Sequence, residues 1–117
     1  MIILSKKLTL SEVATINSFT NGFVKGVVDI EKELVALDAD MHYMLSDYLK
    51  EQKGSKEIDM WGFNLWLGAT GDDILEFDSF INISNNQQHG FLRGGFDIKQ
   101  PYIETKAKEI IHKWIEF

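Results

Sequence analysis

Residues 61–83 read WGFNLWLGATGDDILEFDSFINI, and this stretch decides the fold that we expect for the chain. Two runs rich in apolar and aromatic residues flank a break of glycine, threonine and aspartate at residues 68–73. Glycine and aspartate favour turns, and apolar residues that alternate with polar ones are typical of half-buried strands. The stretch therefore predicts a β-hairpin with strands near residues 58–67 and 74–83.

The two faces of this predicted hairpin differ in composition, because successive side chains of a strand point to opposite faces. One face is apolar apart from Ser79 and is expected to form the core: Trp61, Phe63, Leu65, Leu67, Leu75, Phe77, Ile81 and Ile83. The other face mixes aromatic, acidic and amide groups: Met60, Gly62, Asn64, Trp66, Glu76, Asp78, Phe80 and Asn82. Two interpretations are open. The face is either an ordinary exposed surface, with Phe80 covering Gly62, or a partner surface or pocket wall, which its large apolar groups favour.

The N-terminal half predicts a second hairpin preceded by a helix. A short strand is expected at residues 2–4, and the T-x-x-E capping box at residues 9–12 begins a helix that runs to about Thr20. Residues 23–30 and 33–38 are rich in β-branched side chains and form the hairpin, with Glu31-Lys32 as its turn. Alternation points three of its residues inward (Val24, Val28, Ile30) and three outward (Lys25, Val27, Asp29).

Two further helices follow from apolar residues at helical spacing. Asp40 is the expected N-cap of the first, which carries the stripe Met41, Met44, Leu45, Tyr48 and Leu49 and ends at Gly54-Ser55. Pro101 suits the first position of the closing helix, whose stripe is Ile103, Ala107, Ile110, Ile111 and Trp114. Residues 84–99 are expected to form a long polar loop.

Hairpins followed by helices predict an α+β fold, an antiparallel sheet of two β-hairpins with helices packed on one face. The 117 residues, of which 44% are hydrophobic, correspond to a single globular domain spanning residues 1–117.

Composition narrows the functional classes. The net charge of −6 and the few, dispersed basic residues argue against nucleic acid as a ligand. The chain has no cysteine, which removes disulfides, thiolate nucleophiles and thiolate metal sites. Its apolar runs are shorter than the roughly 20 residues of a membrane helix, so we expect a cytoplasmic protein. No residues suggest a cofactor.

The titratable residues give weak catalytic candidates and no metal motif. His42, at the start of its predicted helix, is a candidate base, and Glu76 and Asp78 are candidate acids. Asp29 and Glu31 would join Glu76 and Asp78 if the two hairpins paired edge to edge, but the spacing matches no known metal site. The simpler interpretation of His42 is a structural one, a histidine at the start of a helix that flanks the apolar stripe.

The chain resembles a family of small prokaryotic proteins of unknown function, DUF5674. The resemblance covers residues 24–84 and rests on VVDIEKELVAL, Asp40-Met41-His42, Gly54-Ser55, WGFNLW and EFDSFINI. The family carries an acidic residue where this chain has Met44, and Arg-Pro where it has Ser84-Asn85. The resemblance implies no activity, but it draws attention to Asp29, His42, Asn64, Asp78 and Asn82.

These features predict a non-enzymatic binding or interaction module that forms a homodimer, with a further protein partner also conceivable. The expected binding residues are Asn64, Trp66, Asp78, Phe80 and Asn82. Trp66, Phe80 and Met60 would anchor the contact, and Asn64 and Asp78 would set its register. The alternative is a small hydrolase that uses Asp78 and Glu76 as acid and base or as divalent-metal ligands, with His42 as proton shuttle. That alternative requires His42 and Asp78 to lie close together.

Overall fold

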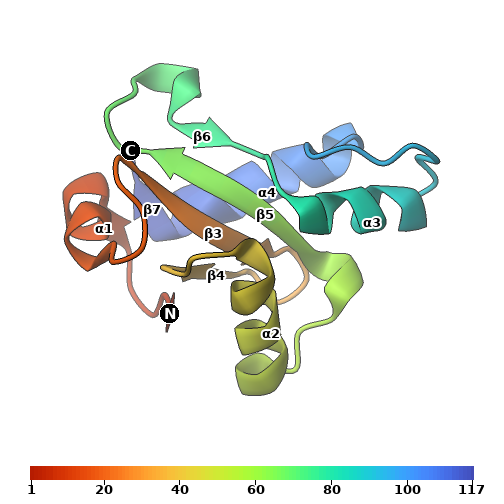
Figure 1. Cartoon of the computed structure of the whole chain (residues 1–117), viewed down its shortest axis with the longest axis horizontal. Coiled ribbons are helices and arrows are strands. Elements are labelled where there is room, and N and C mark those ends of the chain that lie inside the picture. Colours follow the sequence, from red (N-terminus) through yellow and green to blue (C-terminus); the bar gives the residue numbers. More distant parts are fainter.

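A computed structural model describes all residues 1–117 and confirms the α+β class (Figure 1). The main sheet has five antiparallel strands in the order β1-β4-β3-β5-β6: β1 Ile2–Ile3, β4 Leu34–Leu37, β3 Phe23–Asp29, β5 Met60–Trp66 and β6 Leu75–Glu76. A small parallel pair joins β2 (Leu8–Thr9) to β7 (Ile115–Glu116). The helices are α1 Leu10–Ile16, α2 His42–Lys53, α3 Phe80–Gln88 and α4 Pro101–Trp114, with single 3-10 turns at Glu57–Asp59 and Gly71–Asp73.

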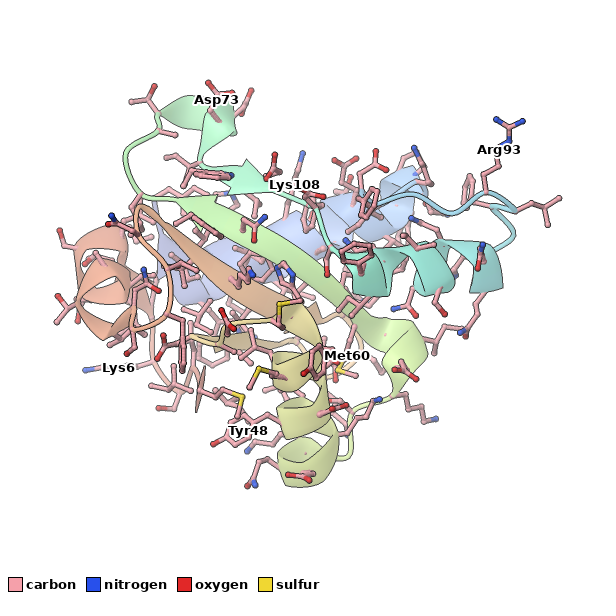
Figure 2. The ribbon with its side chains drawn as sticks, in the orientation of Figure 1. Lys6, Tyr48, Met60, Asp73, Arg93 and Lys108 are labelled. Carbon is pink, nitrogen blue, oxygen red and sulfur yellow. The ribbon has the colours of Figure 1, made fainter.

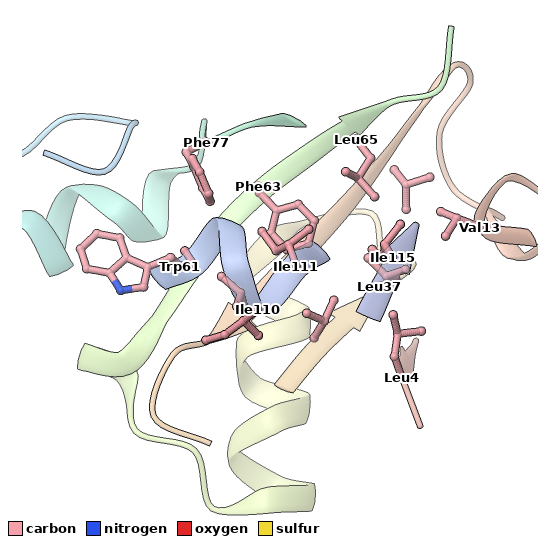
Figure 3. Close-up of a cluster of buried hydrophobic side chains, with 14 of the residues drawn as sticks. Leu4, Val13, Leu37, Trp61, Phe63, Leu65, Phe77, Ile110, Ile111 and Ile115 are labelled. Atoms are coloured by element: carbon pink, nitrogen blue, oxygen red, sulfur yellow. The ribbon is translucent and has the colours of Figure 1, made fainter. Parts of the chain in front are cut away.

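Helices cover both faces of the sheet, whereas the sequence predicted one (Figure 1). Figure 3 shows Trp61, Phe63 and Leu65 of β5 in the larger core, together with Ile110 and Ile111 of α4. The smaller core lies on the other face: Val27, Ala36, Ala39, Leu45, Leu49 and Met60, with Ile81 against it. The period-2 argument correctly assigned residues 61–77 of the first face to the larger core, but Ile81 lies against the smaller core and Ile83 belongs to α3. It also took the second face for an open one.

Met60, Val27 and Asp29 were therefore wrongly expected to be exposed to solvent. Met60 is fully buried in the smaller core, so it cannot anchor an external contact. Asp29 is also fully buried, and its Oδ1 accepts hydrogen bonds from the backbone N–H groups of Glu31 and Lys32. This arrangement stabilises a turn of four residues between β3 and β4, in which Glu33 has φ +56°.

The largest correction concerns the second strand of the C-terminal hairpin. Pairing with β5 stops after Leu75 and Glu76, and residues 80–88 form α3 instead of a strand. The side chain of Ser79 caps α3 by accepting a hydrogen bond from Ile81 N–H, which favours a helix start over continued extension. The predicted long loop is consequently shorter, since residues 84–88 belong to α3.

Several helix boundaries agree with the sequence and others differ. The capping box of Thr9 and Glu12 is present, and Gly54, with φ +68°, ends α2. Pro101 is the first residue of α4, as predicted. By contrast, α1 ends at Ile16, because Asn17 turns the chain by donating to the carbonyls of Thr20 and Phe23.

No helix of the structure is long and apolar enough to cross a membrane.

Candidate functional site

A cavity of about 340 Å³ opens between β5, the start of α2 and the segment that leads into α3. We call it the β5–α2 pocket. Its lining is Phe23, Lys25, Met41, His42, Asn64, Trp66, Asp78, Ser79, Phe80 and Phe96. The pocket brings together five residues singled out in the sequence: His42, Asn64, Trp66, Asp78 and Phe80.

His42 forms part of the wall, as the first residue of α2. Met41, not Asp40 as predicted, is the N-cap, and its extended backbone leads directly into the histidine. His42 Nε2 lies 2.9 Å from the carbonyl oxygen of Phe63, which only accepts hydrogen bonds, so Nε2 carries the proton. In the neutral ring, Nδ1 is then a hydrogen-bond acceptor.

The surroundings keep His42 neutral at physiological pH. Burial of the ring, which is 9% exposed, lowers its pKa below the ordinary value near 6.5, and the charge of Lys25 lowers it further. The Phe63 carbonyl, Asn64 and Asp78 act in the opposite direction without cancelling the effect of burial. Asp78 lines the same pocket as His42.

Asn64 is held in place by Glu76, its partner across the β5–β6 pair. Glu76 Oε1 accepts from Asn64 Nδ2 at 3.3 Å and from Trp66 Nε1 at 3.1 Å. With the amide nitrogen fixed in this way, Asn64 Oδ1 is buried and has no hydrogen-bond partner. This oxygen is closed to solvent, so Asn64 forms part of the pocket wall and does not offer its Oδ1 to a ligand in this conformation. Glu76 does not line the pocket and orients two residues that do.

Two aromatic pairs border the polar groups. The rings of Phe23 and Trp66 are 4.7 Å apart between centroids, and those of Phe80 and Phe96 are 5.2 Å apart in an edge-to-face arrangement. Phe80 is 73% exposed and Trp66 38%, so these large side chains remain available for contact. The site therefore combines acceptors with an aromatic border.

Asn82, predicted as a binding residue, lies in the interior and forms hydrogen bonds with the backbone of β5 and of the segment after α3. Its Oδ1 accepts from Gly62 N–H at 2.8 Å, while its Nδ2 donates to the carbonyls of Gly62 and Phe96. Asn85 donates in the same manner to Met60 O. These asparagines satisfy the edge of β5 where pairing with β6 has ended. Asn82 supports the pocket without lining it.

The predicted carboxylate cluster does not assemble. Asp29 pairs with Met60 at the start of β5, whereas Glu76 pairs with Asn64 near its end. No group of three or more histidine, aspartate or glutamate side chains is placed to hold a metal ion.

The sequence did not reveal several residues of the pocket. Lys25 of β3 pairs with Asn64 of β5. Knowledge of the β3–β5 register would have identified Lys25 as a pocket residue. Phe96 comes from the segment that follows α3. The only signal for Ser79 was that it interrupts the apolar face of the predicted hairpin. Neither could be placed before the helical path of residues 80–88 was known.

The molecule is thus a small α+β domain with a pocket that combines polar and charged side chains, Asp78 and Lys25 among them, with an aromatic border. The chain belongs to the family described as "Protein of unknown function (DUF5674)", whose model matches residues 2–114. The match extends well beyond the residues 24–84 that carried the resemblance. Comparison with curated proteins and with solved structures finds no match.

Replacing His42 with glutamine is expected to flatten the dependence of stability on pH. The pKa of His42 is lower in the folded protein than in the unfolded chain, so the unfolded chain binds the proton first as the pH falls. The contribution of His42 to stability is therefore complete above about pH 6.5. It is lost as the pH falls through the folded-state pKa. His42→Gln retains a donor for the Phe63 carbonyl but does not titrate. Urea unfolding between about pH 7.5 and about pH 5 measures the difference. Equal loss of stability in both proteins would contradict a neutral, buried His42.

Proposed function

We propose that this protein is a non-enzymatic binding module and that the β5–α2 pocket is its binding site. The observation that carries the proposal is a cavity in which the Asp78 carboxylate lies in the same lining as the exposed rings of Trp66 and Phe80. None of the five ion pairs of the structure includes Asp78. A ligand is therefore the natural partner for these groups.

The chemistry of the lining defines the class of ligand. Neutral His42 Nδ1 and the Asp78 carboxylate are hydrogen-bond acceptors, and the Lys25 ammonium in the same lining is a donor. The matching ligand donates hydrogen bonds, as amines, amides, amidines and guanidines do. Trp66 and Phe80 favour ligands that also offer a flat or aliphatic portion, or a positive charge over a ring. A cavity of about 340 Å³ lies at the lower end of the usual range for small-molecule sites.

A thermal-shift screen with amines, amides, guanidines, nucleotides, divalent metals and common metabolites tests the proposal. A ligand at 100 times its dissociation constant adds about 2.7 kcal/mol, which raises the melting temperature of a domain of this size by several degrees. We expect donor-bearing compounds to give the shift. Asp78→Asn removes the carboxylate charge with little change in shape and should abolish or strongly reduce it.

Asp73→Asn is the matched control, because it makes the same chemical change at an exposed residue outside the pocket. Its thermal shifts should equal those of the wild type. Shifts that survive Asp78→Asn, or that Asp73→Asn removes equally, would argue against binding at this pocket, as would the absence of any shift across the donor-bearing compounds.

A hydrolytic enzyme is the second candidate, and one observation favours it. His42 and Asp78 line the same pocket, which supports the closeness that the hydrolase alternative requires, and a neutral histidine is a competent general base. Assays with ester, amide and phosphoester substrates test it. Hydrolysis that His42→Gln abolishes would favour the enzyme. Activity that persists in His42→Gln would exclude a role for this histidine.

A further inference from the structure

One cation and one anion line the β5–α2 pocket, Lys25 and Asp78. None of the five ion pairs of the structure includes either residue, so the two do not neutralise each other and neither has another charged partner. A ligand in this cavity therefore meets a charge of each sign. Complementary charges give specificity, so the best-matched ligand carries both an anionic and a cationic group.

Lys25 is held at the start of α2. The residue is half-buried, and its Nζ donates a hydrogen bond to the carbonyl oxygen of Asp40. An ammonium group has three N–H donors, so this bond leaves donors for a ligand. Met41, the N-cap of α2, also lines the pocket, and its side chain provides no cap for the helix. The positive end of α2 adds to the charge of Lys25, and together they favour a carboxylate.

Asp78 and the aromatic border favour the opposite charge. The Asp78 carboxylate is exposed and has only acceptor atoms, which match the N–H groups of a primary ammonium. The faces of Trp66 and Phe80, in the same lining, attract a cation as well. These rings are 38% and 73% exposed, so they also provide apolar surface on which the rest of a ligand can pack.

A free amino acid carries each of the groups that this lining matches. It has a carboxylate and an ammonium on one carbon, together with a side chain that is apolar in many of its members. The cavity of about 340 Å³ is small for a ligand site, which suits a single amino acid better than a longer peptide. A simple amine would match Asp78 but would leave Lys25 without a partner.

We propose that the β5–α2 pocket binds a free amino acid with an aliphatic or aromatic side chain. Lys25 binds the carboxylate, Asp78 binds the ammonium, and the side chain packs on Trp66 and Phe80. The proposal rests on the proposed function, because it names the class of ligand for the same pocket. Lys25 is then the residue that distinguishes an amino acid from an amine.

Calorimetric titration of the wild type with compounds that share one side chain tests the proposal. Phenylalanine has both charges, phenethylamine lacks the carboxylate, and hydrocinnamate lacks the ammonium. Each analogue loses one charged contact, so each is expected to bind about tenfold more weakly than phenylalanine, or weaker still. Leucine and its corresponding amine and acid form a second series, which covers aliphatic side chains.

Two variants assign the contacts to their residues. Lys25→Gln should lower the affinity for phenylalanine to about that for phenethylamine and leave phenethylamine binding unchanged. Asp78→Asn should lower the affinity for phenylalanine to about that for hydrocinnamate. Lys6→Gln and Asp73→Asn are the matched controls, because they make the same changes at exposed residues outside the pocket and without ion pairs. Figure 2 shows both residues at the periphery of the molecule.

Amino acids that bind no more tightly than their amines would overturn the proposal, and this comparison requires only wild-type protein. Equal losses of phenylalanine and phenethylamine binding in Lys25→Gln would also overturn it. These results are distinct from failure of the proposed function. A pocket that binds phenethylamine as well as phenylalanine remains a binding site for hydrogen-bond donors, whereas the proposed function fails if no donor-bearing compound binds.

Discussion

Asn82→Ala is expected to destabilise the protein by about 3–5 kcal/mol, because it leaves the backbone N–H and the backbone carbonyl of buried Gly62 without partners. Asn82 is fully buried and bonds both the N–H and the carbonyl of Gly62, as a neighbouring strand would. It also joins α3 to the following segment through Phe96 O. Urea denaturation at constant pH measures the loss.

Gln88→Ala is the matched control on the same helix. Gln88 is exposed, and its side chain makes a single bond of 3.4 Å to Ser84 Oγ. A change within about 0.5 kcal/mol is expected there. Similar losses in the free energy of unfolding for Asn82→Ala and Gln88→Ala would contradict the role of Asn82 in hydrogen-bonding the edge of β5.

Gly26→Ala is expected to cost about 3 kcal/mol by overpacking the larger core. Gly26 pairs with Phe63 across the β3–β5 ladder, and the aromatic ring lies over it. A Cβ atom at Gly26 would approach Phe63 Cε2 to 2.6 Å and Cε1 to 2.8 Å. Phe63 is fully buried, so its ring cannot move without displacing other core side chains. Thermal and urea unfolding report the loss.

Gly68→Ala separates this steric effect from the general effect of replacing glycine. No atom lies within 4 Å of the position of its Cβ, and its backbone is outside the left-handed region. The expected change is within about 0.5 kcal/mol. In addition, Phe63→Leu should partly relieve Gly26→Ala, giving a non-additive double variant. Strict additivity would contradict a direct clash between residues 26 and 63.

Local patterns predicted the elements whose stability is mainly local or follows from one dominant periodicity. The β-branched run of β3, the Thr9–Glu12 capping box and the apolar stripe of α4 all carry such signals. The prediction of a strand at residues 77–83 was wrong because the apolar residues of this segment alternate as they do in strands. Ser79 and the asparagines of α3 outweigh this alternation by bonding to backbone groups that are distant in sequence, which no local pattern contains.

The candidate site was predicted better than the path of the chain that forms it. His42, Asn64, Trp66, Asp78 and Phe80 share one cavity, yet Asp78 and Phe80 reach it through a strand end and a helix start. The aromatic and polar composition of one face of the predicted hairpin identified Asn64, Trp66, Asp78 and Phe80. His42 was identified separately, as a titratable residue at the start of its helix. The binding roles predicted for Met60 and Asn82 were wrong, because the sequence did not predict that α2 and α3 bury these residues.

An NMR titration with a guanidinium compound tests most directly whether the β5–α2 pocket binds hydrogen-bond donors. The Trp66 indole N–H and the Asn64 side-chain amide report on the pocket, and the Trp114 indole, which donates to Glu33 O, is an internal reference outside it. The account predicts saturable shifts of the Trp66 and Asn64 signals with an unchanged Trp114 signal, and loss of these shifts in Asp78→Asn. Shifts that do not saturate, or that affect Trp114 equally, would contradict it.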